Sequence, residues 1–203
     1  EEGISTVQNK NYNKPWSLCF VGRIESEKGV GRILEALKTS PDLSAIKDVH
    51  FVGEGPEKES FEKVARQLPV PITFHGALNR RELFRIYKKS HLFLLPTAAS
   101  EGFPKVIAEA MTFGCIPITS NISSISHYIN ESTGFIWDPE QENFPEFFSK
   151  CNVSPEKLRQ KSQNIQKVAV AFTFEHYSAR IFRDIIINGS HVHMMQNKTM
   201  SSV

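Results

Sequence analysis

The sequence predicts an α/β protein built on a Rossmann-like, doubly wound parallel sheet. Short apolar runs, which indicate buried strands, alternate with amphipathic segments of ten or more residues, which indicate helices. Several of the apolar runs end in glycine, as expected where a strand passes into a tight turn. With 203 residues and 40% hydrophobic content, the chain can bury one sizeable core.

The strand predictions rest on short runs of apolar residues followed by turn residues. The run that begins at Trp16 is the first, and the run at Leu92 leads into the most informative turn of the chain. The last run is short and suits an edge position. In chain order, the predicted strands are residues 16–22, 50–53, 72–76, 92–95, 116–119 and 134–137.

The helix predictions rest on apolar spacing and on capping residues. Asn79 is a good N-cap, and Ser154-Pro155-Glu156 combines a cap, a first-position proline and a first-turn acid. Pro104 likewise suits the first position of a helix. The predicted helices are residues 30–39, 57–68, 80–89, 104–111, 122–129, 140–150, 155–171 and 175–187.

The domain prediction divides the chain into three parts. Residues 1–14 are polar and rich in asparagine, and we expect a linker or incoming segment. Residues 15–188 form the folded domain, and residues 189–203 are expected to be a polar, disordered tail.

Composition limits the classes of function. A net charge of +2 gives no strong global attraction to nucleic acid or to a membrane. The three cysteines lie far apart and lack metal-ligand spacing, so we expect reduced thiols in an intracellular protein. No apolar run reaches the roughly 20 residues that a membrane span needs. The expected location is the cytoplasm, with the cytoplasmic face of the membrane as the alternative.

Residues 100–111 are the stretch around which the predicted site is organised. They follow a buried strand, contain a glycine turn and run into a helix, which is the usual place for an anionic ligand in such a sheet. Because parallel sheets bind ligands at the carboxyl ends of their strands, the informative residues follow each strand. These segments are residues 23–29, 53–56, 76–78, 101–105 and 121–124.

Several common sites are missing from the sequence. There is no GxGxxG fingerprint after the first strand, and Gly53-Glu54-Gly55-Pro56 is only half of one. There is also no P-loop and no Asp-x-Asp pair, so we expect no protein-bound metal. Without a metal, a diphosphate needs fixed positive charge, which Arg23 and Lys28 can supply from one loop. The alternative is that both are solvated charges beside Glu25 and Glu27.

Two carboxylates, Glu101 and Glu109, lie eight residues apart in the same stretch. A helical separation of that length is roughly 10–12 Å at about 1.5 Å per residue. Glycosidase carboxylates lie closer, about 5–9 Å apart, so two contacts on one extended ligand fit better. Ionised carboxylates accept hydrogen bonds, which suits the hydroxyls of a sugar and a ribose. The alternative is a surface Glu109 and a Glu101 that complements the helix dipole.

These residues resemble the carboxyl-terminal domain of the GT-B glycosyltransferases, specifically the retaining group called "glycosyl transferases group 1", which is similar to GT4. The match covers most of the chain, from about Trp16 to about Ile187. The motifs that carry it are Phe20-Val21-Gly22-Arg23, Glu27-Lys28-Gly29, Val52-Gly53-Glu54-Gly55-Pro56, Phe74-His75-Gly76 and the Glu-x7-Glu stretch from Glu101 to Glu109.

The resemblance implies that residues 15–188 bind a nucleotide-diphosphate sugar, most often a UDP- or GDP-sugar, with no tightly bound cofactor. It implies that Arg23 and Lys28 hold the diphosphate, that Glu101 faces the donor sugar and that Glu109 binds the ribose. The implied catalytic residues are Arg23, Lys28 and Glu101. The other implied donor-binding positions are Gly22, Gly53, Gly55, Gly76, Leu78, Gly102, Phe103, Pro104, Lys105, Val106 and Glu109.

The family pairs this domain with an amino-terminal domain that holds the acceptor, a glycan or lipid-linked glycan, and that domain is missing here. We therefore expect the isolated domain to be inactive as a hexosyltransferase. Relatives often carry a small or apolar residue at the position of Lys105. Two alternatives stay open for this lysine: a contact to phosphate, or a side chain that points to solvent. Bacterial polysaccharide biosynthesis is a usual context. No nucleic acid is expected, and peripheral attachment of the full-length enzyme to a membrane is an open alternative.

Two other functions are compatible with the same motifs. A GT-B sugar-nucleotide epimerase would use the same diphosphate pocket, although the Glu-x7-Glu stretch favours a transferase. A non-catalytic nucleotide-sugar-binding module would keep the fold without turnover, although the presence of all four charged residues argues against it. Histidines such as His75 and His91 have no partner at ligand spacing and are expected to be packed or exposed residues. His127 and Tyr128 are candidates for the pocket edge.

Overall fold

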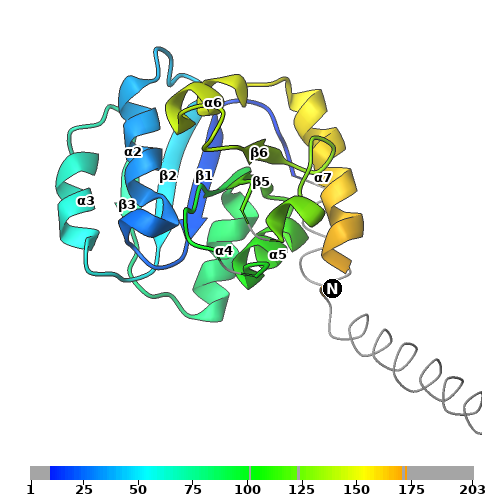
Figure 1. The fold of residues 1–203 in the computed structure, drawn as a ribbon, viewed down its shortest axis with the longest axis horizontal. Helices are drawn as coiled ribbons and strands as arrows, with labels where there is room; N and C mark the ends of the chain where they lie inside the picture. Colours follow the sequence, from blue (N-terminus) through cyan, green and yellow to red (C-terminus); the bar gives the residue numbers. More distant parts are fainter. Residues whose placement is uncertain (1–9, 101, 123, 171, 173–203) are drawn as a thin grey trace, which may run out of the picture. The chain divides into compact units, whose positions relative to one another are not determined.

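The computed structural model describes residues 10–100, 102–122, 124–170 and 172 of the chain. The chain divides into two compact units, residues 1–166 and 167–203. In the first, a sheet of six parallel strands has the order β3-β2-β1-β4-β5-β6 (Figure 1). The strands are β1 (Trp16–Val21), β2 (Ile46–Val52), β3 (Ile72–Phe74), β4 (Leu92–Leu95), β5 (Ile116–Ser120) and β6 (Phe135–Trp137).

The strand order confirms the predicted Rossmann-like, doubly wound class. The chain moves outward from β1 to β3, returns to pair β4 with β1, and moves outward again to β6. Every strand pair is parallel, so all carboxyl ends meet at one edge of the sheet. The order reverses between β1 and β4, and ligands of open α/β sheets bind beside such a switch point.

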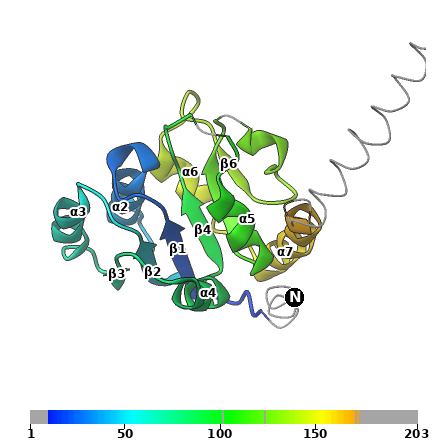
Figure 2. The same ribbon diagram turned by 90° about the horizontal axis from the view of Figure 1, so that it is seen from below.

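Helices cover both faces of the sheet (Figure 2). One face carries α2, α3 and α6, and the other carries α4 and α5. Two short 3-10 helices, η1 and η2, lie in the connections. The helical segments are η1 (Ser26–Lys28), α2 (Val30–Thr39), α3 (Lys58–Ala65), α4 (Arg80–Lys89), α5 (Lys105–Thr112), η2 (Ile125–His127), α6 (Phe144–Lys150) and α7 (Pro155–Val170).

The apolar runs form the core, as predicted. All residues of β1, β4 and β5 are buried, because helices cover both faces of these central strands. The Asn79 cap is also confirmed. Its side chain accepts a hydrogen bond from the Glu82 amide, and the Glu82 carboxylate accepts one from the Asn79 amide, which is a complete capping box.

Residues 10–16 pack closely against the domain. Lys10 Nζ donates to the carbonyl oxygens of Tyr87, Ser90 and Phe113, which lie at the carboxyl ends of α4 and α5. A cation there satisfies helix-end carbonyls and complements both helix dipoles. Tyr12 is only 1% exposed, and its hydroxyl is 2.7 Å from the Gly114 carbonyl oxygen. The linker role of residues 1–14 stays a prediction.

Four element predictions were wrong in part. Of the helix predicted over residues 122–129, only the 3-10 turn Ile125–His127 forms in the described residues. Serines at positions 124 and 126 are weak helix formers, and so short a segment cannot offset the cost of nucleation. The helix predicted from residue 104 begins at Lys105, and Pro104 is its N-cap.

The helix predicted over residues 140–150 begins only at Phe144. Asp138 Oδ1 accepts a hydrogen bond from the Glu140 amide at 3.0 Å, which folds the preceding residues into a turn instead. Asn143 then caps α6 through the Glu146 amide. Elsewhere β2 begins at Ile46, four residues before its predicted start. The helix predicted over residues 175–187 and the tail at 189–203 lie outside the described residues.

Candidate functional site

The turns after β1, β2 and β3 are joined backbone to backbone at the carboxyl edge of the sheet. The Gly53 amide donates to the Gly76 carbonyl oxygen at 2.8 Å, and the Gly22 amide donates to Val52 at 3.0 Å. Gly53 has a φ of +135°, and a Cβ placed on it would lie 1.9 Å from the Gly22 oxygen. Only glycine allows this approach, so Gly22, Gly53 and Gly76 form one continuous backbone surface.

Gly55 extends the same contact toward the first loop. The Ile24 amide donates to the Glu54 carbonyl oxygen at 3.0 Å. A Cβ on Gly55 would lie 2.1 Å from the Ile24 oxygen, so this position also requires glycine for space. Ile24 itself is fully buried and anchors the loop that carries Arg23.

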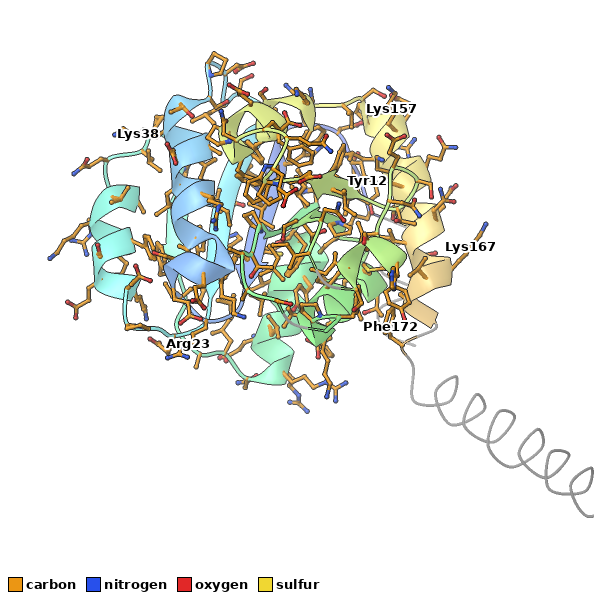
Figure 3. All side chains as sticks on the ribbon, viewed as in Figure 1. Tyr12, Arg23, Lys38, Lys157, Lys167 and Phe172 are labelled. Atoms are coloured by element: carbon orange, nitrogen blue, oxygen red, sulfur yellow. The ribbon has the colours of Figure 1, made fainter. Side chains whose placement is uncertain are left out.

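Arg23 lies at the solvent-facing edge, below the start of α2 in Figure 3. Its side chain is 66% exposed, and its Nε is 3.1 Å from Glu25 Oε2. An exposed ion pair of this kind contributes little, about 0–1 kcal/mol, so an anionic ligand could displace Glu25. The guanidinium keeps further N–H donors for such a ligand.

The 3-10 turn that carries Lys28 is fixed from the α3 side by Glu57. One Glu57 oxygen accepts a hydrogen bond from the Ser26 amide at 2.6 Å, and the other accepts one from the Ser26 hydroxyl at 2.6 Å. These two bonds lower the pKa of the Glu57 carboxyl. Ser26 is the first residue of the turn and Lys28 the last, so Glu57 sets the position of the whole turn.

The same turn is fixed from the β4 side by the segment that leads to Glu101. The Glu27 carbonyl oxygen accepts from the Ala98 amide at 2.7 Å and from the Thr97 hydroxyl at 3.1 Å. Gly29 has a φ of +88°, and a Cβ there would lie 2.2 Å from the Pro96 oxygen. The half-buried Lys28 is therefore held where the first loop meets the segment after β4.

The amino-terminal end of α5 follows β4 at the same edge of the sheet. Gly102 is exposed, and a Cβ placed on it would meet no atom within 4 Å. Phe103 packs edge-on against Tyr128, with ring centroids 4.8 Å apart. Lys105 is exposed, in agreement with the solvent alternative, and Val106 is half-buried. Free amides in the first turn of α5 can donate to an anion.

Glu109 lies one helical turn further along α5 and is exposed. This agrees with a surface position and leaves the carboxylate accessible to a ligand. The buried Tyr87 of α4 lies nearby: burial raises the pKa of the Tyr87 hydroxyl, and the Glu109 charge raises it further. Glu101 itself lies outside the described residues.

The turn after β3 completes the edge. Gly76 has a φ of +70°, and a Cβ there would lie 2.5 Å from Glu54 Oε1. Glu54 pairs with Lys58 at 3.0 Å, and the same Cβ would lie 3.4 Å from Lys58 Nζ, so both side chains, which follow β2 in the chain, lie against the turn after β3. Leu78 is half-buried at the entrance to α4.

Comparison with known proteins identifies the family. The model of the family "Glycosyl transferases group 1" matches residues 4–168. This chain belongs to that family. The chain is 34% identical over 137 residues to sulfoquinovosyl transferase SQD2 of Arabidopsis thaliana, covering 66% of the chain and 25% of the relative. It is 30% identical over 132 residues to lipopolysaccharide glucosyltransferase WaaG of Escherichia coli, covering 65% and 33%. The chain thus spans only a quarter to a third of these relatives.

Solved structures confirm the fold of this chain. The catalytic domain of cholesterol-alpha-glucosyltransferase from Helicobacter pylori superposes with a TM-score of 0.68 at 20% identity, covering 78% of this chain and 99% of that one. Anabaena HepE in complex with UDP and glucose superposes with a TM-score of 0.66 at 17% identity, covering 100% and 52%. The fold is that of the carboxyl-terminal half of GT-B glycosyltransferases.

The structure brings the predicted site residues of the first three turns together at one edge of the sheet. The turns that carry Arg23, Lys28 and the glycines are bonded to one another, and the turn of Lys28 is bonded to Thr97 and Ala98, which follow β4. Two hollows lie elsewhere: one of about 770 Å³ includes Arg32 and Trp137, and one of about 820 Å³ includes Phe135 and Lys161. None of the predicted donor-binding residues lines either hollow. In the described residues, no three His, Cys, Asp or Glu side chains form a metal-binding group.

The sequence analysis did not predict a contact between two histidines, of which His50 is buried and His75 is half-buried. His75 Nε2 lies 3.1 Å from His50 Nδ1, and His50 Nε2 lies 3.2 Å from Asp48 Oδ1. Desolvation, with help from the Lys89 charge, lowers the pKa of His50 to about 4 and also lowers that of His75. No sequence spacing signals the pair, because the two residues belong to neighbouring strands. His75 precedes Gly76, so the pair supports the turn at the predicted base site.

Proposed function

We propose that this chain is the donor-binding half of a retaining glycosyltransferase that uses a nucleoside-diphosphate sugar. The observation that carries the proposal is the bonding of the Lys28 turn to Thr97–Ala98. These bonds join the turn of Lys28 to the segment that leads from β4 to α5, and Arg23 belongs to the same loop as Lys28. A diphosphate needs positive charge and amide donors together, and this junction supplies both.

The leaving diphosphate gains negative charge as the sugar–oxygen bond breaks. Arg23 can bind phosphate oxygens with its fork of N–H groups, and Lys28 can add a fixed point charge. Such preorganised charges stabilise the transition state more than the ground state, which is the condition for catalysis. This account requires no protein-bound metal, and metal independence is part of the proposal.

The remaining contacts follow from the geometry of the edge. Glu109, exposed on α5, would accept hydrogen bonds from the ribose hydroxyls, and Glu101 would face the donor sugar. The nucleotide would lie along the first three turns, with the base beside Gly76 and Leu78. HepE is crystallised with UDP and glucose, which supports a UDP-sugar as donor, with a GDP-sugar as the alternative.

The acceptor belongs to the proposal as well. The names of three similar proteins refer to cholesterol, lipopolysaccharide and sulfoquinovosyl transfer. Cholesterol and lipopolysaccharide are membrane components, which supports a lipid-linked acceptor here. It would be held by an amino-terminal domain, so the described domain alone is expected to bind the donor without turnover. The proposed place of action is the cytoplasmic face of a membrane.

Calorimetric titration of the chain with UDP, GDP and ADP tests the proposal. We expect measurable binding of UDP or GDP, weaker binding by Arg23→Ala and Glu109→Ala, and unchanged binding by Lys38→Ala, whose side chain lies on α2 away from the edge (Figure 3). Absence of binding by all three nucleotides would overturn the proposal. Equal binding by the site variants and the parent would do the same.

A further inference from the structure

The outward face of α4 carries an unusual concentration of positive charge. Arg80–Lys89 contains five cationic side chains and one carboxylate, a net charge of +4. The whole chain has a net charge of +2, so all other residues together sum to −2. The excess positive charge of this protein is therefore located on one helix of ten residues.

The cations lie on the side of α4 that faces away from the sheet. Ile86 and Tyr87 are buried and fix the inner side of the helix. Arg81, Arg85 and Lys88 recur at spacings of four and three residues, which places them in one row on the opposite side. Arg80 and Lys89 flank this row. We call these five residues the α4 basic face.

Three of these five cations have no ion-pair partner among the described residues. Among the residues that the structure describes, no carboxylate forms an ion pair with Arg81, Arg85 or Lys89. All three side chains are exposed. Glu82, the acid of the helix, is occupied in the capping box with Asn79. Phe84 lies along the edge of the face, half-buried under the Arg80 guanidinium at 5.1 Å and beside Phe113.

We propose that the α4 basic face docks the protein on a membrane surface rich in anionic phospholipids. A row of cations along a helix that lies flat on the domain matches a planar negative surface. The amino-terminal end of α4 follows the turn of Gly76 and Leu78, so docking would hold the carboxyl edge of the sheet beside the lipid. The inference rests on the proposed lipid-linked acceptor, because holding the carboxyl edge of the sheet beside the lipid serves catalysis only if the acceptor is in the membrane.

Vesicle co-sedimentation of the whole chain tests the proposal without nucleotide. We expect binding to vesicles of equal parts phosphatidylcholine and phosphatidylglycerol, weak binding to pure phosphatidylcholine, and release at high salt. The triple variant Arg81→Glu/Arg85→Glu/Lys89→Glu should lose about 100-fold in affinity, since each cation near an anionic surface contributes roughly five-fold. Circular dichroism verifies that the variant is folded.

A matched variant separates local charge from net charge. Lys38→Glu/Lys63→Glu/Lys157→Glu changes net charge equally at exposed sites on α2, α3 and α7, and Lys38 and Lys157 are labelled in Figure 3. It should bind anionic vesicles within a few-fold of the parent. An equal loss in both triple variants would overturn the proposal, as would tighter binding of the parent to duplex DNA than to the vesicles at the same salt.

Nucleotide titration distinguishes this inference from the proposed function. We expect the α4 triple variant to bind the nucleoside diphosphate as the parent does, because none of the three residues belongs to the donor site. Failure of vesicle binding with intact nucleotide binding would overturn the membrane inference alone. Failure of nucleotide binding in the parent would overturn the proposed donor site instead.

Discussion

Glu57 holds Ser26 with both carboxylate oxygens, each 2.6 Å from its donor. The two residues are 31 positions apart, and the contact joins the start of α3 to the turn that carries Lys28. Together with the bonds from Thr97 and Ala98 to Glu27, it fixes this turn from both sides. A cation that is already held in position binds phosphate more tightly, because the ligand does not lose binding free energy in ordering the side chain.

Replacing Glu57 by Gln should therefore weaken donor binding, although Glu57 itself does not contact the ligand in the proposed site. An amide keeps one acceptor for Ser26 and loses the charge, so we expect about 3- to 10-fold weaker binding of the nucleoside diphosphate. Glu59→Gln, an exposed acid one position beyond the helix start, is the matched control and should bind like the parent. Equal affinities for Glu57→Gln and parent would show that the contact does not position Lys28.

The Glu57 contact should also give a defined pH dependence. The Ser26 bonds lower the pKa of the Glu57 carboxyl from its ordinary value of 4.5. The stabilisation is therefore complete above that value and is lost only as the pH falls through the lowered pKa. Between neutral pH and about pH 5, ionisation of Glu57 should not change donor affinity. Any loss of affinity in this range should therefore be the same in the parent and in Glu57→Gln. A loss near neutral pH that disappears in Glu57→Gln would contradict this assignment.

Removing the Arg23 guanidinium should affect ligand binding and leave stability unchanged. Its side chain is mostly exposed and, among the described residues, forms an ion pair only with Glu25, so Arg23→Ala removes little packing. We expect about 10- to 100-fold weaker binding of a nucleoside diphosphate, since a charge-assisted contact to phosphate is lost. Titration calorimetry and urea unfolding measure the two effects. A large fall in unfolding free energy would instead indicate a structural role.

Glycines of the site should differ sharply in their tolerance of alanine. Gly53→Ala would place a Cβ 1.9 Å from the Gly22 oxygen at a positive φ, so we expect a loss of about 2 kcal/mol or more in unfolding free energy. Gly102→Ala meets no atom within 4 Å and should leave stability within about 0.5 kcal/mol. Urea denaturation of both variants checks the contrast. Equal stabilities would contradict the close approach of the first two turns.

His50 should make the protein less stable in mild acid. Desolvation lowers its pKa from 6.5 to about 4, so the folded state binds fewer protons than the unfolded state between these values. Stability is then full above pH 6.5 and falls as the pH drops toward 4, by up to about 3 kcal/mol. His50→Gln should flatten this part of the urea-midpoint profile, whereas the exposed His127→Gln should not. Parallel profiles for His50→Gln and the parent would exclude this origin.

Apolar periodicity and capping residues in the sequence were sufficient to predict most helices and strands. The apolar run of β4 was predicted with its observed ends, and Asn79 with Glu82 makes the capping box that starts α4. The failures occurred where short polar segments were read as helix. At Asp138 a side chain competed with the helix for the backbone amides, and after residue 122 serines left only one 3-10 turn.

The sequence by itself determined the fold class, the family and which charged residues and glycines follow the strands, because periodicity and turn chemistry are local properties. Only the tertiary structure decided which of these residues meet. The Glu57–Ser26 contact, the His50–His75 pair and the approach of Gly53 to Gly22 join residues that are 25 or more positions apart. Such contacts depend on strand order and register, which bring separate turns to one edge of the sheet.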